Sequence, residues 1–254
     1  MRDRLTFAVL LLVAPAFFCA RAQTPSAQTP AATAAPAPAN PDPCEAMRKK
    51  LDDWPQLGRY AAENAALPAQ QPGRVVFYGD SITDAWGRRP DTGEFFPGKP
   101  YINRGISGQT TEQMVVRFRQ DVIDLHPEAV VILAGTNDIA GNTGPETPET
   151  IENDFRSMVD LARANHIRVI LASITPADRY PWKPSAGDPS AEIRQINDWL
   201  QHFCEENGLT YLDYWDAMAG PNGGMKPGIS KDGVHPNTKG YGIMTPLAEA
   251  ALAK

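Results

Sequence analysis

Five short apolar runs recur in the second and later parts of the chain, and polar residues do not alternate within them. The runs cover residues 74–78, 101–106, 129–134, 167–174 and 209–212. Most are rich in Val, Ile and Leu. Strands that are covered on both faces lack polar alternation, because neither face meets water. The pattern therefore predicts five buried strands.

The segments between these runs carry apolar residues at helical spacing. We expect helices to begin at Thr110, Thr147, Ser190 and Asn237. Gln113 completes a capping box at the first of them. Pro148 occupies the first helical position of the second, where proline is tolerated, and Gly208 suits the end of the third. An earlier amphipathic stretch, residues 44–67, is also predicted to be helical, with a break near Pro55.

Strands that alternate with helices predict an α/β fold. A parallel sheet of five strands lies between two layers of helices in such a fold, and the three-layer α/β/α arrangement is built from right-handed crossovers. The 254 residues are enough for one substantial core. Active sites of these sheets lie beyond the carboxyl ends of the strands. Several polar, glycine-rich blocks of this chain follow predicted strand ends.

The N-terminal region has the features of an export signal. An apolar stretch covers residues 5–20, and residues 20–22 match an A-x-A cleavage site, so we predict a signal peptide over residues 1–22. An uncleaved membrane anchor is the alternative, but Pro15 interrupts a run that is short for a membrane span. Cys19 raises the alternative of a lipoprotein. Two phenylalanines precede it where small residues are expected, so we disfavour a lipid anchor.

The next segment has a low-complexity composition. Residues 23–43 are almost entirely Ala, Pro, Thr, Gln and Ser, which offer too few large apolar groups to offset the entropy of ordering. We predict a disordered linker there and one globular domain over residues 44–254. A cleaved signal implies a secreted or periplasmic protein with no stable membrane insertion after cleavage.

Charge and cysteine content narrow the list of partners. The formal net charge is −6, and removal of residues 1–22 takes away a net +2, which leaves −8. A mildly acidic protein without a basic run is not expected to bind nucleic acid. Cys44 and Cys204 remain in the mature chain. They either pair in an oxidising compartment or stay as two thiols.

The first strand ends on Gly79, Asp80 and Ser81. A serine ejected from a strand end becomes a nucleophile when a base takes its proton and a carboxylate orients that base. The alternative is that Asp80 and Ser81 only cap a turn. Thr83 stands where the G-x-S-x-G elbow needs glycine, so the α/β-hydrolase fold is not indicated.

A second block, near the C-terminus, supplies the missing partners. Asp232 and His235 are three residues apart, and Pro236 fixes the exit of their loop. A carboxylate at this distance can hold the imidazole tautomer and leave the other ring nitrogen free to act on Ser81. A lone histidine is more often a packing or surface residue, but the paired aspartate favours catalysis.

Two middle blocks are candidates for an oxyanion hole. Residues 103–108 precede a capped helix, and residues 135–138 end the most apolar strand. The N–H groups of Ser81 and Gly108, with the side-chain amide of Asn137, would supply three donors. Taken alone, Gly108 is equally a turn glycine and Asn137 a helix cap. Zinc motifs, dinucleotide fingerprints and P-loops are not found, so we expect no metal.

Together these blocks resemble the SGNH hydrolase superfamily, also called the GDSL esterases and lipases. The matching motifs are Gly79-Asp80-Ser81-Ile82, Asn103-x-Gly105-x-x-Gly108, Gly135-Thr136-Asn137-Asp138 and Asp232-x-x-His235. The resemblance implies a nucleophilic Ser81, a general base His235 oriented by Asp232, and Gly108 and Asn137 as oxyanion donors. It also implies a flavodoxin-like fold without metal or organic cofactor. Ile82 replaces the usual leucine and conserves volume. The chain is similar to platelet-activating-factor-acetylhydrolase-like and carbohydrate acetylesterase members.

The expected activity is hydrolysis of short-chain acyl esters, with acetyl esters of small molecules or carbohydrates as the favoured substrates. Candidate substrate contacts are Asp80, Trp86, Arg104, Tyr180 and Trp182. The aromatic ones are equally ordinary core residues. The alternatives are an O-acyltransferase acting on glycans, a non-catalytic glycan-binding domain with the same fold, and an esterase for lipid, lysophospholipase-like esters.

Overall fold

A sheet of five parallel strands forms the centre of the protein in this computed structural model, which describes residues 43–254. The predicted signal peptide and all of the predicted linker except Pro43 lie outside the described residues. The strands are β1 (Val75–Gly79), β2 (Tyr101–Gly105), β3 (Ala129–Leu133), β4 (Arg168–Ala172) and β5 (Thr210–Leu212). The helices are α1 (Pro43–Asp52), α2 (Ala61–Ala66), α3 (Ser81–Ala85), α4 (Thr111–Asp121), α5 (Thr136–Ile139), α6 (Pro148–Ala164), α7 (Ser190–Asn207), α8 (Trp215–Met218) and α9 (Thr238–Leu252), with 3₁₀ turns at Ile123–Leu125 and Pro184–Ala186.

The strand order is β2-β1-β3-β4-β5. This is the order of the flavodoxin-like doubly wound sheet. Successive strands are added towards one edge up to β2 and towards the other edge from β3 onwards, so the switch point lies between β1 and β3. The five-stranded parallel sheet and the α/β fold class are confirmed. Each of the five strands coincides with one of the predicted apolar runs. Most strand ends agree with the ends of the run to within about one residue, which is the usual uncertainty of element boundaries.

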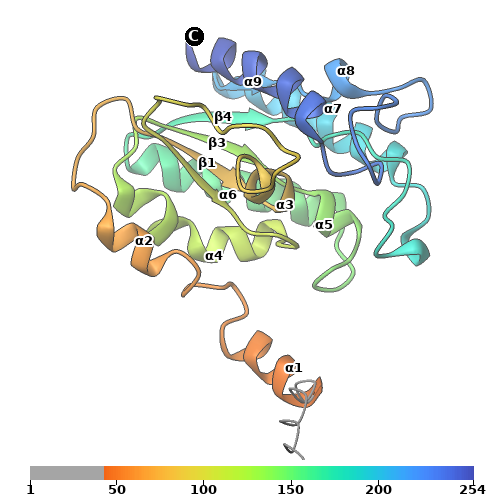
Figure 1. The fold of residues 1–254 in the computed structure, drawn as a ribbon, viewed down its shortest axis with the longest axis horizontal. Helices are drawn as coiled ribbons and strands as arrows, with labels where there is room; N and C mark the ends of the chain where they lie inside the picture. Colours follow the sequence, from red (N-terminus) through yellow and green to blue (C-terminus); the bar gives the residue numbers. More distant parts are fainter. Residues whose placement is uncertain (1–42) are drawn as a thin grey trace, which may run out of the picture. The chain divides into compact units, whose positions relative to one another are not determined.

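Helices cover both faces of the sheet, because successive strand residues point to opposite faces. On one face, Val76 and Ile132 belong to a core with α4, α6 and α7. On the other, Phe77 and Val131 pack with residues of α3, α8 and α9. Figure 1 shows α4 below the sheet and α9 above it. The predicted three layers are therefore present in the described chain.

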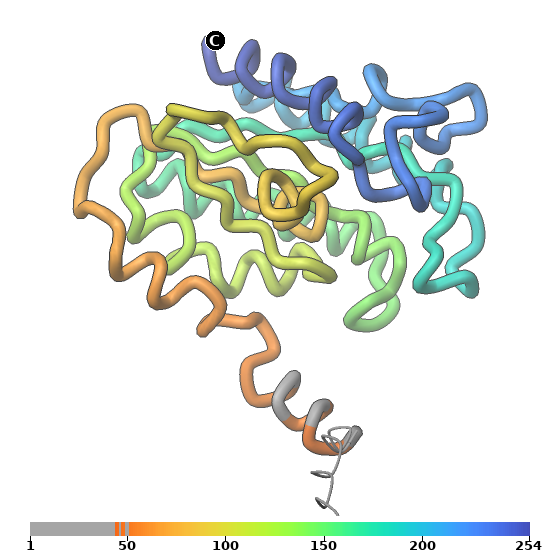
Figure 2. Tube along the Cα trace, viewed as in Figure 1, coloured from red at the N-terminus to blue at the C-terminus, as the bar shows by residue number. Residues whose placement is uncertain are grey.

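The segment ahead of the sheet agrees with its prediction. The expected helical stretch over residues 44–67 with a break near Pro55 is present as α1 and α2, and residues 53–60 form the turns that separate them. Gln56 has a φ of 57°, which no right-handed helix accepts. The side chain of Asp53 instead accepts from the N–H of Leu57 at 2.7 Å and stabilises this turn. Beyond it, α2 lies beside α4 (Figure 2). Asn64 of α2 donates to the Gln120 carbonyl of α4 at 3.1 Å.

The two cysteines are not joined to each other. Cys44 is exposed on α1, whereas Cys204 is buried on the inner face of α7. Burial raises the pKa of the Cys204 thiol to about 12, so this thiol is a packing group with little thiolate character. The disulfide between Cys44 and Cys204, one of the two interpretations that the sequence leaves open, is therefore not formed in the structure.

The strand ends are in register at the edge where the polar blocks emerge. Gly79 of β1 lies beside Gly105 of β2 on one side and Leu133 of β3 on the other. The residues that follow these three positions therefore leave the sheet at the same level. This places the blocks after residues 79, 105 and 133 next to one another at the switch point of the sheet.

Candidate active site

Ser81 occupies the first position of α3, immediately after β1. The turn between them depends on Gly79, since a Cβ there would lie 2.3 Å from Thr83 Oγ1 and 2.5 Å from the Leu133 carbonyl. Asp80 caps α3 and accepts from the N–H of Ile82 at 2.9 Å. The tight exit therefore holds the Ser81 hydroxyl at the sheet edge, where the residue is 8% exposed.

Ser81 lies within hydrogen-bond distance of His235, although 154 residues separate them in sequence. The Oγ atom of Ser81 is 2.8 Å from His235 Nε2, and His235 Nδ1 is 2.6 Å from Asp232 Oδ2. An ionised Asp232 accepts a hydrogen bond from the Nδ1–H group, which leaves Nε2 as the acceptor for the serine hydroxyl. The geometry is that of a nucleophile, its base and the carboxylate that orients the base.

The loop of Asp232 keeps its carboxylate ionised. Oδ1 accepts from the N–H groups of His235 at 2.8 Å and Val234 at 2.9 Å, and from the Ser230 hydroxyl at 3.1 Å. Partial burial raises the pKa of Asp232, but these hydrogen bonds and His235 outweigh it and lower the pKa to about 2. The carboxylate therefore carries its charge throughout the neutral range and can stabilise an imidazolium on His235.

Three donors face the region in front of Ser81. Within the part of the chain that the structure describes, the N–H groups of Ser81 and Gly108 donate to no other group. Gly108 has a φ of +84°, and a residue with a side chain would be strained in this backbone conformation. Asn137 Nδ2 donates to the Gln109 carbonyl at 3.0 Å, and its second hydrogen has only a long contact of 3.4 Å with Asp80 Oδ2. This set fits an oxyanion hole.

Asn142 holds the amide of Asn137 in this orientation. Its Nδ2 donates to Asn137 Oδ1 at 2.8 Å and to the Gly108 carbonyl at 3.1 Å. Its Oδ1 accepts from the indole N–H of Trp182 at 3.1 Å. Asn137 Oδ1 is therefore engaged as an acceptor, and its Nδ2 stays on the side of the serine. One side chain connects two oxyanion donors and the aromatic wall of the site.

A cavity of about 320 Å³ lies over Ser81 and His235. Its other walls include Arg89, Ser107, Asn142 and Trp182. The indole of Trp182 is 40% exposed, and its ring centre lies 5.9 Å from that of His235. Trp182 is the one large apolar side chain in this lining. The site is therefore small and mostly polar.

Comparison with known proteins assigns the family. Residues 77–243 match the GDSL-like Lipase/Acylhydrolase family. The chain belongs to this family. Its members are carboxylic ester hydrolases, and the resemblance seen in the sequence motifs is confirmed.

Several individual proteins are similar to this chain. The crystal structure of a candidate acylhydrolase from Bacteroides fragilis NCTC 9343 has a TM-score of 0.75 and 43% identity, and it covers 79% of this chain and 97% of that one. The uncharacterized lipoprotein YqeF of Bacillus subtilis (strain 168) is 37% identical over 143 residues, 48% of this chain and 58% of that protein. The acetylxylan esterase of Geobacillus stearothermophilus is 33% identical over 87 residues, 26% of this chain and 40% of that enzyme. The platelet-activating factor acetylhydrolase IB subunit alpha1 of Homo sapiens is 28% identical over 131 residues, 50% of this chain and 52% of that subunit. The chain spans about half the length of these curated relatives.

Two of the five candidate substrate contacts lie away from the cavity. Trp86 is 2% exposed and packs against Phe77, Phe96 and Tyr241 in the core. Arg104 is 3% exposed, and its guanidinium lies over the ring of Tyr60. Neither side chain offers a surface to a substrate, which corrects the expectation that they contact one. Both have structural roles, since aromatic stacking and cation–π contacts stabilise buried rings.

Asp80 and Tyr180 support the site from beneath. Asp80 is 1% exposed, and burial raises the pKa of its carboxyl to about 6, although the Ile82 N–H counteracts part of this effect. Tyr180 is 1% exposed and packs against Trp182 with ring centres 5.0 Å apart. Of the five candidates, only Trp182 is still predicted to contact the substrate directly. Asp80 and Tyr180 instead position the residues next to them.

Arg89, Ser107 and Asn142 also line the cavity, although none of them is among the five candidate contacts. Arg89 and Asn142 fall in the loops after α3 and α5, where no motif marks them. The sequence marks these two residues only by their position in loops that follow strand ends, where functional residues are common. Within residues 43–254, no three His, Cys, Asp or Glu side chains are grouped so that they could hold a metal ion.

Proposed function

We propose that this protein is an exported serine esterase that removes short acyl groups, chiefly acetyl, from carbohydrate esters. The observation that carries the proposal is the connected series Ser81, His235 and Asp232, with contacts of 2.8 Å and 2.6 Å. Within the described residues, the Ser81 hydroxyl and the His235 ring nitrogens have no other hydrogen-bond partner, and the further hydrogen bonds to Asp232 Oδ1 come from its own loop and hold the carboxylate in place. Such a series is the minimum apparatus for activating a hydroxyl at neutral pH.

The reaction would proceed through an acyl-enzyme. Ser81 Oγ attacks the ester carbonyl carbon while His235 Nε2 takes the hydroxyl proton. The negative charge that develops on the carbonyl oxygen accepts hydrogen bonds from Ser81 N–H, Gly108 N–H and Asn137 Nδ2. His235 then gives its proton to the departing alcohol as the C–O bond breaks. A water molecule, deprotonated by His235, releases the acid and restores Ser81.

The lining of the cavity supports a short acyl group. Burial of each methylene of an acyl chain contributes about 0.8 kcal/mol only where the chain meets apolar walls. Here Trp182 is the one large apolar wall residue, and the remaining lining is polar or charged. A long acyl chain would therefore gain little, and an acetyl group loses nothing. This favours acetyl esters over the alternative of lipid esters.

The carbohydrate and export parts of the proposal rest on other support. An acetylxylan esterase is among the relatives, although the match covers 40% of that enzyme. Export to a secreted or periplasmic location follows from the leader pattern in residues 1–22. YqeF is described as a lipoprotein. Among residues 43–254, none of the helices has the length and apolarity to cross a bilayer.

Turnover of p-nitrophenyl esters of increasing acyl length tests the proposal. We expect the acetate to be the best substrate and the octanoate the worst, with kcat/KM falling as methylenes are added. Ser81→Ala should lower kcat by at least about 10³-fold, since the nucleophile is lost. Equal rates in the variant and the parent would reject the mechanism. A supplied sugar that becomes acetylated in preference to hydrolysis would instead identify an O-acyltransferase.

A further inference from the structure

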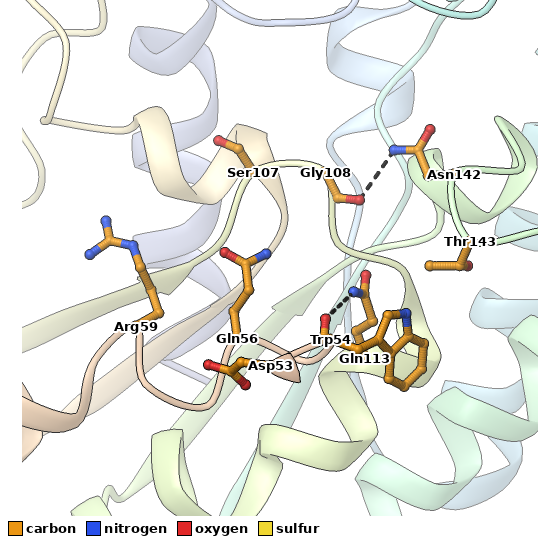
Figure 3. A pocket seen from close by; sticks show the side chains of 9 residues that line it. All are labelled: Asp53, Trp54, Gln56, Arg59, Ser107, Gly108, Gln113, Asn142 and Thr143. Carbon is orange, nitrogen blue, oxygen red and sulfur yellow. Dashed lines mark hydrogen bonds between the residues drawn. The ribbon is translucent and has the colours of Figure 1, made fainter. Parts of the chain in front are cut away.

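A second and larger cavity adjoins the catalytic one. It has a volume of about 930 Å³ and shares Ser107, Gly108 and Asn142 with the cavity over Ser81. Figure 3 shows its lining, with Arg59 on the left, Asn142 and Thr143 on the right and the Trp54 indole below Thr143. A ligand portion that leaves the oxyanion hole on the side of Gly108 would therefore enter this groove directly.

One wall of the groove comes from residues 53–59, which precede the family-matched region at residues 77–243. This segment is not helical, and its main chain is tied to the protein by a row of glutamine side chains. The amide of Gln113 donates to the Trp54 carbonyl at 2.6 Å, and that of Gln109 donates to the Pro55 carbonyl at 2.7 Å. The Gln120 amide does the same for Leu57 at 2.6 Å. We call residues 53–59 the strap.

The strap presents Trp54 to the groove. Its backbone carbonyl is held, but the residue remains 37% exposed. A single exposed indole is common at a protein surface, so its place in the groove wall is what makes it informative: it offers a flat apolar face to whatever enters the groove. Trp54 lines the groove together with hydrogen-bonding side chains, among them Gln56, Arg59 and Thr143. The wall therefore combines one flat aromatic face with several donors and acceptors.

This combination fits a sugar ring better than an acyl chain. A pyranose has an apolar face of C–H groups that stacks on an aromatic ring and a rim of hydroxyls that need hydrogen-bond partners. An acyl chain would find Trp54 and otherwise polar walls, which would leave those polar groups without partners. The chemistry of the lining residues therefore favours a sugar as the occupant of the groove.

We propose that the strap groove is a carbohydrate subsite, in which Trp54 stacks on a sugar unit next to the one whose ester is opened at Ser81. The inference rests on the proposed function and adds the substrate class, an ester of an oligosaccharide. It also gives the strap a role in specificity that lies outside the region shared with the family.

Steady-state kinetics of the full chain test this subsite. Trp54→Ala should raise KM about threefold to tenfold for acetylated xylotriose and for cellobiose octaacetate, since a stacking partner is lost. Its kcat/KM for p-nitrophenyl acetate should stay within about twofold, because that ester does not reach the strap. Trp54→Phe keeps a flat ring and should recover most of the affinity. Leu57→Ala is the matched control in the same strap, since Leu57 is 39% exposed and does not line the groove.

Three results would overturn the subsite. The first is an unchanged KM for both sugar esters in Trp54→Ala while p-nitrophenyl acetate is still hydrolysed. The second is a Trp54→Ala variant that loses activity towards p-nitrophenyl octanoate but keeps its activity towards the sugar esters, which would identify an acyl-chain groove. If the parent hydrolyses no ester, the proposed function fails by itself. Calorimetry with unacetylated xylotriose then decides the subsite, because weaker binding by Trp54→Ala supports it and equal binding is the third contrary result.

Discussion

Asn142 donates its side-chain amide to Asn137 Oδ1 at 2.8 Å, and this contact determines which end of the Asn137 amide faces Ser81. An amide can present either its oxygen or its nitrogen to a site, and only the nitrogen stabilises an oxyanion. Asn142 does not need to touch the substrate to affect the reaction. It is a positioning residue for the oxyanion hole.

Asn142→Asp should therefore lower kcat. A carboxylate at this position cannot donate to Asn137 Oδ1, and it attracts the Asn137 Nδ2 away from the serine. We expect kcat for p-nitrophenyl acetate to fall by about tenfold or more. The loss should be smaller than the 10²- to 10³-fold decrease in kcat that follows complete removal of an oxyanion donor. The KM for this small ester should change little. An unchanged kcat with an intact thermal unfolding transition would show that Asn137 is oriented without Asn142.

The pH profile of hydrolysis should contain no step from Asp232. The pKa of Asp232 is about 2, so its carboxylate stays charged over the whole working range. A protonated imidazole cannot accept the Ser81 proton, so hydrolysis should decline once the medium is acidic enough to protonate His235. The measurement is kcat/KM for p-nitrophenyl acetate at constant ionic strength. A profile that stays level into acid solution would mean that His235 is not the base.

Much of this site could be predicted from the sequence, because its signals are local. Buried strands show as apolar runs, the helix start at Thr110 shows as a capping box, and the motif around Ser81 marks a turn that only glycine permits at residue 79. The Asp232–His235 pair lies within one loop.

The remainder depends on tertiary partners that no local pattern records. Trp86 and Arg104 sit in motif-rich segments, but the rings and carbonyls that bury them come from distant positions. The same holds for the strap, whose turns depend on three glutamines at residues 109–120. Pro55 predicts a break in the helix there, but the left-handed Gln56 and the glutamine contacts that shape the break could not be predicted.

Gly105 is required because β2 packs directly on the backbone of α3. A Cβ at this position would lie 2.1 Å from the Asp84 nitrogen and 2.6 Å from the Thr83 carbonyl carbon. Gly105→Ala must therefore displace α3, the helix that begins at Ser81. We expect a loss of about 1–3 kcal/mol in the free energy of unfolding by urea, accompanied by lower kcat.

The matched control for this substitution is Gly242→Ala. Gly242 is exposed within α9, and a Cβ there would have no neighbour within 4 Å. Alanine in a helix interior is favoured over glycine by about 0.5–1 kcal/mol, so this variant should be slightly more stable than the parent. Equal stability of Gly105→Ala and the parent would contradict the close approach of β2 and α3.

Asp138 should make stability depend on pH. Its carboxyl is 2% exposed, and burial raises the pKa to about 7, although Thr111 donates to it and counteracts part of this effect. A carboxyl whose folded pKa exceeds its unfolded value favours the fold fully below the unfolded pKa. That contribution is lost as the pH rises from about 4 to about 7.

Asp138→Asn removes this titration and keeps an acceptor for Thr111. The free energy of unfolding of the variant, relative to the parent, should therefore rise with pH between about 4 and 7 and then level off. The rise should not exceed about 1.4 kcal/mol per pH unit for one group. Urea unfolding at a series of pH values provides the measurement. A constant difference between variant and parent would show that Asp138 is not the titrating group.

The central claim is that Ser81 is the nucleophile, and covalent labelling with a fluorophosphonate tests it most directly. Ser107 provides an internal comparison, because it shares the cavity but its hydroxyl donates to Asp84 at 2.6 Å and, among the described residues, makes no hydrogen bond to a histidine. Peptide mapping by mass spectrometry should place a single adduct on Ser81 in the parent and in Ser107→Ala, and none in Ser81→Ala. An adduct on Ser107, or labelling of Ser81→Ala at the parent's rate, would contradict the account.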